Sequence, residues 1–289
     1  MSQAPTSTAA ALERAASDFS IVAAVVQLES GDDIARNLQR VAHWTARASE
    51  QGAELVVLPE NFAYFGSESD KRRFAESLNQ PGPILESLQQ LALSRQVVIV
   101  AAGMPEQGAD PERPYNTSVV IDARGNLLAS YRKVHLFDVD LPDGTSYRES
   151  RATSAGDSAL VLPLLGANVG LAICYDLRFP RLFEALRTRE AQVLALGAAF
   201  TDQTGRDHWH VLLRARAIET QTWVLAAAQW GRHPGERRTY GHALIVDPWG
   251  TVVAECSNRE GVALATLDGA LVEQVRARIP CALHRKPLS

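Results

Sequence analysis

The feature that most constrains the fold is a repeated alternation of short apolar runs with segments of helical periodicity. Residues 21–27 form a β-branched, apolar run, and residues 55–58 form a second one. Between them, residues 34–48 place apolar side chains at helical spacing, with Ser30 or Asp32 as candidate N-caps. A strand, a helix and a second strand in this order predict a βαβ unit and an α/β fold.

The same rhythm continues along the chain, and two stretches depart from it. Further helical segments lead into the apolar runs at residues 97–101 and 193–196. Residues 118–130 and 243–254 instead place a glycine-containing turn between two apolar runs, which is typical of a hairpin. Their likeness hints at an internal pseudo-symmetry. The sequence therefore predicts mixed β-sheets flanked by helices, in a sandwich rather than an all-parallel arrangement.

The domain organisation follows from where the composition changes. Residues 1–18 are rich in Ser, Thr and Ala, and we expect a flexible leader there. No linker rich in Pro, Gly or Ser interrupts the interior, so residues 19–289 are predicted to form a single domain. Its last part, from about residue 268 to 289, is polar and basic and is expected to be a C-terminal arm.

Charge and composition exclude several classes of partner. The 289 residues carry 29 Lys and Arg against 33 Asp and Glu, a net charge of −4, and the basic residues are scattered. We therefore expect no nucleic-acid partner and no membrane partner, because neither has an electrostatic footprint here. No apolar stretch approaches the roughly 18 to 20 residues that span a bilayer, and the start of the chain lacks a signal-peptide pattern. We expect a cytoplasmic protein.

The three cysteines are odd in number and far apart, which argues against a disulfide framework or a zinc site: Cys174, Cys256 and Cys281. Cys174 ends the apolar run in GLAICYDLRFP, and polar residues follow it directly. A cysteine in a core is usually a small inert residue. At the carboxyl end of a strand in an open α/β sheet, however, it stands where ligands bind. Taken alone, Cys174 fits both interpretations.

Two charged side chains end other strands of the same predicted sheet. Glu60 follows residues 55–58, although a loop glutamate that reaches solvent fits equally well. Lys133 closes the second strand of the first hairpin, where a solvated edge lysine is the common alternative. Glu149 by itself is an ordinary loop carboxylate. A carboxylate, an ammonium and a thiol at the strand ends of one sheet can meet at one rim, which favours a catalytic site.

A pair of histidines gives a much weaker signal. His208 and His210 are separated by one residue, a spacing that suits a metal only on an extended segment. The residues from His208 onward follow helical periodicity instead. Because no further ligand is evident, we expect no metal site at this pair.

Three motifs in this order resemble the nitrilase, or carbon–nitrogen hydrolase, superfamily. LVVLPENF is similar to its glutamate motif and carries onto Glu60, YRKVHLFD carries onto Lys133, and GLAICYDLRFP carries onto Cys174. Its supporting glutamate matches Glu149 in YRES. The resemblance runs from about residue 19 to 287 and implies an αββα sandwich. In the family this sandwich pairs into an αββα-αββα dimer, so a homodimer or higher homo-oligomer is expected.

The resemblance also implies a mechanism. Cys174 would attack an amide carbonyl while Glu60 takes its proton, and a thioester would form on the cysteine. Lys133 and the backbone N–H of Tyr175 would face the oxyanion, with Glu149 in support. Glu60 would then protonate the departing amine and activate the water that releases the acid. No metal and no organic cofactor has a role in this scheme. The resting protonation state of Cys174 cannot be read from the sequence.

Local stretches resemble one branch of the superfamily in particular. HWHVLLRARAIETQTWVLAAAQWGRH and RRTYGHALIVDPWGTVVAEC resemble the deaminated glutathione amidase branch. This implies cleavage of deaminated glutathione to 2-oxoglutarate and cysteinylglycine. The ω-amidase branch, which hydrolyses 2-oxoglutaramate, shares ICYDLRF and remains an alternative. Hydrolysis of a carbamoyl group, an aliphatic amide or a nitrile, or a non-catalytic binding role, also stays open.

The implied substrate is a small-molecule amide that carries an oxo-acid carboxylate. Arg178 is the first candidate to bind that carboxylate through two parallel hydrogen bonds, although an ion pair with Asp176 or Glu184 is equally compatible. Phe200 and Thr201 follow a predicted strand and are candidates for the wall of the acyl pocket, with a plain loop as the alternative.

Overall fold

The computed structural model of the chain describes residues 18–140 and 144–286. The predicted leader, apart from Asp18, lies outside the described residues. The strands are β1 (Ser20–Leu28), β2 (Leu55–Leu58), β3 (Val98–Glu106), β4 (Tyr115–Ile121), β5 (Leu127–Arg132), β6 (Asp138–Asp140), β7 (Ser146–Arg148), β8 (Val161–Leu164), β9 (Ala167–Ile173), β10 (Val193–Ala198), β11 (Trp223–Arg232), β12 (Arg238–Tyr240), β13 (Leu244–Val246), β14 (Val252–Glu255) and β15 (Gly261–Asp268). The helices are α2 (Ile34–Glu50), α3 (Pro83–Arg95), α4 (Pro180–Thr188), α5 (Asp202–Thr220), α6 (Gly269–Arg278) and α7 (Cys281–His284), with the 3-10 helices η1 (Glu68–Phe74), η2 (Glu149–Arg151) and η3 (Cys174–Arg178).

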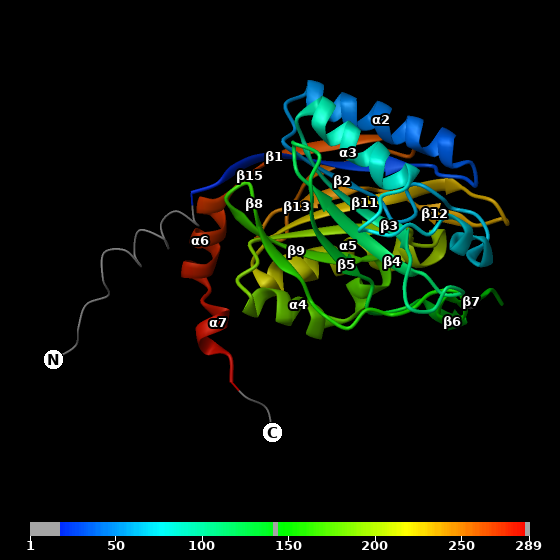
Figure 1. The fold of residues 1–289 in the computed structure, drawn as a ribbon. Helices are drawn as coiled ribbons and strands as arrows, with labels where there is room; N and C mark the ends of the chain where they lie inside the picture. Colours follow the sequence, from blue (N-terminus) through cyan, green and yellow to red (C-terminus); the bar gives the residue numbers. More distant parts are fainter. Residues whose placement is uncertain (1–17, 141–143, 287–289) are drawn as a thin grey trace.

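The main sheet has two halves that stack face to face. Its longest path runs β5-β4-β3-β2-β1-β11-β10-β9-β8, with β15 paired to β1 and β13 paired to β11. Among the described residues, strand pairing joins the two halves only at the ends of β1 and β11, where Gln27 pairs with Ala228 and Leu28 with Gln229. Helices α2 and α3 pack against one half, and α4 and α5 lie against the other (Figure 1). This confirms the predicted αββα sandwich with mixed strands.

The alternation of side chains along β1 shows how the layers are held together. Ala23 and Val25 face the core between the two halves, where they join the cluster that includes Leu171 of β9. Ala24, next along the strand, faces the opposite way and packs in the cluster formed with α2 and α3. Because neighbouring residues of a strand point to opposite faces, a strand between two apolar layers must be apolar throughout. This is why β1 reads as a continuous apolar run.

The local predictions are confirmed, except for one helix start. Both predicted hairpins form, as the antiparallel pairs β4–β5 and β13–β14. The N-cap of α2 is Asp33, whose side chain accepts a hydrogen bond from the N–H of Arg36 at 3.0 Å. The prediction of Ser30 or Asp32 is therefore wrong. The reason is spacing, since a capping side chain reaches the second or third N–H of the helix, and the Ser30 hydroxyl instead donates to Phe62 O.

The segment predicted to be an arm begins with a helix that packs on the sandwich. In α6, Val272 is fully buried and Val275 is 4% exposed. The side chain of Gln221 also donates to Ile279 O at 2.6 Å, just beyond the end of α6. Helix α7 follows with all of its residues exposed, and it leads away from the sheets (Figure 1). Among the described residues, no helix is long and apolar enough to cross a membrane.

Candidate active site

The strand ends bring the predicted residues together at one pocket of about 710 Å³, a volume that includes its open mouth. Glu60 lies two positions after β2, Lys133 directly after β5, and Cys174 directly after β9. The pocket lining includes these three and also the other predicted site residues, which are Glu149, Tyr175, Arg178, Phe200 and Thr201. All eight predicted residues therefore line one cavity.

Two residues of the pocket lining, Cys174 and Asn61, have unusual backbone geometry. Cys174 has a φ of +46°, in the left-handed region that residues with a Cβ rarely occupy. Asn61, directly after Glu60, has a φ of +61°. Two glycines make room for this turn, because a Cβ at Gly103 would lie 2.2 Å from Asn61 N and one at Gly197 would lie 2.5 Å from a β2 carbonyl oxygen. Outliers of this kind concentrate at functional sites, where the surrounding structure maintains them.

Lys133 lies at the centre of a buried hydrogen-bond network. Its Nζ is 2.8 Å from Glu60 Oε1 and 2.8 Å from Glu149 Oε2. Asn116 Nδ2 donates to both carboxylates, at 2.9 Å to Glu60 Oε1 and 3.2 Å to Glu149 Oε1. The N–H of Phe137 also donates to Glu149 at 2.7 Å. With exposures of 4% for Glu60, 1% for Lys133 and 8% for Glu149, these charges are compensated by one another rather than by bulk water.

Burial and charge set the protonation states of the network. Burial raises the pKa of Glu60, but the charge and hydrogen bond of Lys133 outweigh it and hold that pKa below 4.5. Burial lowers the pKa of Lys133, yet Glu149 and Glu60 together raise it well above 10.5. Burial and the neighbouring Glu60 raise the pKa of the Cys174 thiol well above 9.0. At neutral pH the site therefore holds a carboxylate, an ammonium and a neutral thiol, and a hydrogen bond joins the thiol to Glu60.

Asp176 anchors the turn that carries Cys174, a role that the sequence did not reveal. Its Oδ2 accepts from the Tyr131 hydroxyl at 2.7 Å and from Ile173 N at 2.9 Å. Its Oδ1 accepts from the backbone N–H of His135 at 3.0 Å and lies 2.7 Å from the ring nitrogen of His135. Tyr131 and His135 flank Lys133 in the chain, so Asp176 ties the Cys174 turn to the segment that presents Lys133.

Arg178 is oriented by aromatic groups rather than by carboxylates. Its guanidinium lies 5.0 Å from the ring centroid of Phe200, and its Nη1 is 3.1 Å from His208 Nδ1. Among the described residues it forms no ion pair, because the buried Asp176 has the partners given above and Glu184 pairs with Arg285 at 3.4 Å. The predicted alternative of an ion pair with either residue is therefore wrong.

The sequence also missed several polar residues at the pocket and directly behind it. Asn116 lies at the start of β4 and bridges the Glu60 and Glu149 carboxylates behind the pocket lining, and the signal for it is a polar YNTS stretch that opens an otherwise apolar strand. Lys71 and Arg237 line the pocket, and both are paired with Glu68, at 2.7 Å each. These residues come from a 3-10 helix and from the loop before β12. No local pattern relates them to the motifs, because only the fold brings them close.

Comparison with known proteins identifies the family. The family model described as carbon-nitrogen hydrolase matches residues 22–277. The chain belongs to the carbon–nitrogen hydrolase family. A curated relative of this family from Synechocystis sp., named deaminated glutathione amidase, is 43% identical over 269 residues, covering 91% of this chain and 97% of the relative. This confirms the predicted resemblance.

Solved structures of carbon–nitrogen hydrolases share the fold. The NitFhit protein of C. elegans matches with a TM-score of 0.87 at 37% identity, over 93% of this chain and 66% of that chain. An amidase from Nesterenkonia sp. AN1 matches with a TM-score of 0.75 at 28% identity, over 91% of this chain and 96% of that chain. A mutant of that amidase carries the acetamide moiety of fluoroacetamide covalently at its active-site cysteine. The present chain is thus a hydrolase of carbon–nitrogen bonds, with small-molecule amides as its substrate class.

Proposed function

We propose that this carbon–nitrogen hydrolase is a cysteine-dependent amidase that cleaves deaminated glutathione to 2-oxoglutarate and cysteinylglycine. The observation that carries the proposal is the buried contact of Glu60 with both Lys133 and the Cys174 thiol in the lining of one pocket. The name of the Synechocystis relative supports the choice of substrate. Covalent modification of the active-site cysteine in the Nesterenkonia amidase supports the choice of nucleophile.

The first half of the proposed reaction uses the resting state described above. Glu60 accepts the thiol proton while Cys174 Sγ forms a bond to the amide carbon. Because the two events occur together, no free thiolate forms next to the Glu60 carboxylate. Negative charge moves to the carbonyl oxygen, where the Lys133 ammonium and the backbone N–H of Tyr175 stabilise it. The carbon–nitrogen bond then breaks, Glu60 returns its proton to the leaving nitrogen, and the acyl group remains on Cys174 as a thioester.

The second half releases the acid. Glu60, again a carboxylate, takes a proton from a water molecule that attacks the thioester carbon. The carbon–sulfur bond breaks and the proton passes back to Cys174, which restores the starting state. Glu149 acts through Lys133, because its carboxylate holds the ammonium in place and favours its charged form throughout. Every proton in this cycle is accounted for by Glu60, Cys174, water and the leaving amine.

Recognition of the acyl group is assigned to the wall beside Cys174. The acyl part of deaminated glutathione carries an oxo-acid carboxylate, which needs a positive partner in a partly buried pocket. Arg178 lines the pocket four positions after Cys174, and its guanidinium is held by the Phe200 ring and His208 while forming no ion pair within the described residues. Phe200 and Thr201 then form the side of the acyl pocket.

The test measures 2-oxoglutarate release from deaminated glutathione and, in parallel, from 2-oxoglutaramate. We expect kcat/KM to be clearly higher for deaminated glutathione. A preference for 2-oxoglutaramate would move the chain to the ω-amidase alternative and leave the nucleophile unaffected. If neither amide is cleaved, assays of carbamoyl amino acids, aliphatic amides and nitriles would identify another substrate class and overturn the proposal.

We also propose that copies of the chain associate as homodimers or larger assemblies. Val211 and Ile218 of α5 are 67% and 51% exposed, and Trp249 in the β13–β14 turn is 55% exposed. The turn lies against α5, since a Cβ at Gly250 would be 2.6 Å from Ile218. Exposed apolar patches of this kind are typical of interfaces. Sedimentation should show a dimer that Trp249→Glu dissociates, whereas Leu128→Glu on β5 should leave it intact; a monomeric wild type would contradict the proposal.

A further inference from the structure

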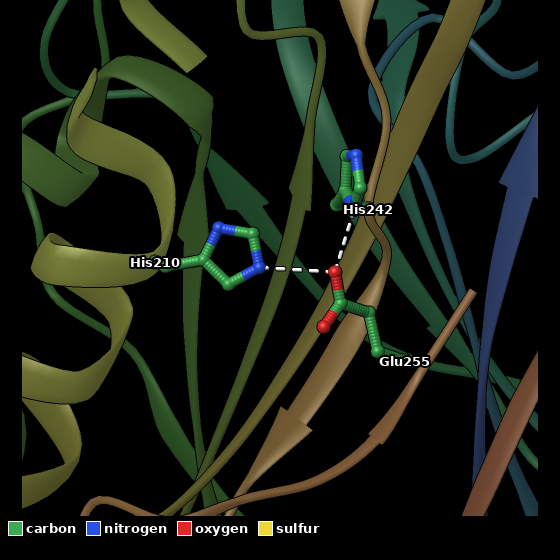
Figure 2. Close-up of side chains that lie close together, drawn as sticks. All are labelled: His210, His242 and Glu255. Atoms are coloured by element: carbon green, nitrogen blue, oxygen red, sulfur yellow. Dashed lines mark hydrogen bonds and ion pairs between the residues drawn. The ribbon is translucent and has the colours of Figure 1, made fainter. Parts of the chain in front are cut away.

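Two histidines and a glutamate that the amidase reaction does not use meet at one point on the surface. His210 extends from α5, His242 from the connection between β12 and β13, and Glu255 from the end of β14 (Figure 2). His210 Nε2 is 3.0 Å from Glu255 Oε1, and His242 Nδ1 is 2.5 Å from the same oxygen. One ligand atom from each of the three residues lies within 4.8 Å of the others. Both rings thus direct a nitrogen toward one carboxylate.

The donor set is that of a transition-metal site. Two imidazole nitrogens and one carboxylate oxygen are ligands that Zn²⁺ accepts, and three protein ligands with one open position are common for this ion. Metal–ligand distances of about 2.0–2.2 Å place tetrahedral donors roughly 3.3 Å apart. The nitrogen–oxygen spacings of 3.0 and 2.5 Å are shorter than this by less than about 1 Å, so side-chain rotations that move the donors apart by that amount would admit an ion. Water would complete the coordination at the open position.

The environment of His242 holds its ring and backbone in place. The Tyr240 ring stacks on it with a centroid distance of 4.3 Å, and Trp209 Nε1 donates to its carbonyl oxygen at 2.8 Å. His242 has a φ of +59° and follows Gly241 at +76°, so two successive residues are in the left-handed region. A backbone outlier without a role in the known site is itself a reason to look for function. The contacts with Tyr240 and Trp209 fix the position of the His242 ring and backbone in the absence of an ion.

The site is also reachable from solvent. The side chains of His210, His242 and Glu255 are 32%, 22% and 33% exposed. His242 and Tyr240 line an open depression of about 1210 Å³, which provides a route for an ion and its water. The ligands come from three separate elements, so a bound ion would cross-link α5 to β14 and to the connection that follows β12.

We propose that His210, His242 and Glu255 form a binding site for a divalent zinc-type metal ion on the surface of the α5 layer. This revises the expectation that His210 has no further ligand, because Glu255 lies 45 positions later in the chain and only the fold makes it a neighbour. His208, its partner in the HWH motif, turns instead to Arg178. The site takes no part in the proposed amidase reaction. A bound ion would restrain α5, whose N-cap Thr201 lies on the wall of the amidase pocket.

Calorimetric titration of the full-length, chelator-treated protein with Zn²⁺ tests the proposal. We expect one ion per chain in the wild type, and an affinity at least about tenfold lower in His242→Asn and Glu255→Gln, since even the loss of a residue that only supports a ligand costs that much. Asparagine tolerates the left-handed backbone at residue 242, so this change removes the ligand with little strain. His284→Asn is the matched control, because α7 offers Cys281 and His284 as a rival zinc pair.

A second readout separates this site from binding by thiols and from a metal-free role. The absorption spectrum of the cobalt-loaded protein is this readout. Cobalt bound by imidazole and carboxylate should lack the thiolate charge-transfer band that binding to Cys174 or Cys281 would produce. Zinc should also raise the unfolding temperature of the wild type and of His284→Asn, but not that of His242→Asn or Glu255→Gln. Unchanged affinity in both ligand variants, or no zinc binding by a folded wild type, would overturn the proposal and leave the trio as a hydrogen-bonded contact.

Discussion

Two clusters of ionisable side chains differ strongly in burial: one is enclosed in the protein and the other is partly exposed at its surface. In the first, Lys133 is shared between Glu60 and Glu149 and all three are at most 8% exposed. In the second, Glu255 is shared between His210 and His242, and the three side chains are between 22% and 33% exposed. Both consist of three groups joined by short contacts to a central one. Their difference in solvent access determines what each can do.

Burial makes the first cluster dependent on every one of its members. A buried charge without its partner has no water to replace it, so the carboxylates and the ammonium keep one another ionised. The same network places a carboxylate beside a neutral thiol, which is the arrangement that a concerted proton transfer requires. The second cluster can exchange its contacts with water or with an ion at small cost. The rigid, buried cluster therefore suits a reaction site, whereas the solvent-accessible cluster suits the binding of an ion.

The largest effect is expected for the nucleophile. Cys174→Ala should lower kcat/KM for deaminated glutathione by about 10⁴-fold or more, because no thioester can form. The assay is 2-oxoglutarate release, and Cys281→Ala, which changes an exposed cysteine in α7, should retain wild-type activity. Activity within tenfold of wild type in Cys174→Ala would show that the nucleophile is another group.

The second prediction breaks the buried cluster at its centre. Lys133→Met leaves Glu60 and Glu149 buried without their cation, and we expect the free energy of unfolding to fall by about 3–5 kcal/mol. Denaturant unfolding measures the change. Arg47→Met, at an ion pair whose side chains are 58% and 53% exposed, is the comparison and should cost less than about 1 kcal/mol. Equal losses in the two variants would mean that burial does not distinguish the pairs.

The third prediction concerns substrate recognition at Arg178. Arg178→Leu should raise KM for deaminated glutathione by about 10- to 100-fold with a smaller change in kcat, since a charged hydrogen bond contributes about 1.5–3 kcal/mol. The KM for an amide substrate without a carboxylate on its acyl side should change little in the same variant. If both substrates are affected alike, Arg178 shapes the pocket without binding the carboxylate.

The pH profile tests the charge states of the buried cluster. The pKa of Glu60 is lowered below 4.5, so its carboxylate form, and the stability that this form contributes, persist above pH 4.5 and are lost as the pH falls further. We expect kcat/KM to be flat through neutral pH and to fall about tenfold per pH unit on the acidic side only below about pH 4.5. An acidic limb centred near pH 6.5 would instead assign the base to a histidine.

The smallest effect is expected where the same chemical change is made at the exposed cluster. Without metal, Glu255→Gln should alter the free energy of unfolding by less than about 1 kcal/mol, because water can replace the lost contacts. Glu149→Gln, the matched change in the buried cluster, should cost several times more, since it leaves Lys133 with one counter-charge fewer. Thermal and denaturant unfolding of both variants in a chelating buffer gives the two values. A larger loss of unfolding free energy in Glu255→Gln than in Glu149→Gln would contradict the prediction.

Much of the fold was predictable because its signals are local. The continuous apolar run of β1, the helical spacing in α2 and the glycine turns of the two hairpins each follow from side-chain periodicity over a few residues. The N-cap of α2 was misplaced because Ser30, Asp32 and Asp33 are all suitable capping residues, and only the course of the backbone selects among them. Helix α6 was missed because its apolar residues are too few to produce a clear periodicity, although Val272 is fully buried.

For the candidate site, the sequence by itself determined which reactive groups end the strands and in what order, since Glu60, Lys133 and Cys174 each occupy a short local motif. Only the tertiary structure decided their charge states, because burial and the neighbours of a group set its pKa. It also decided the partners of Asn116 and Asp176, and the meeting of His210 with Glu255. Chemistry within a motif is encoded in a few neighbouring residues, whereas desolvation and contacts between distant segments exist only once the chain has folded.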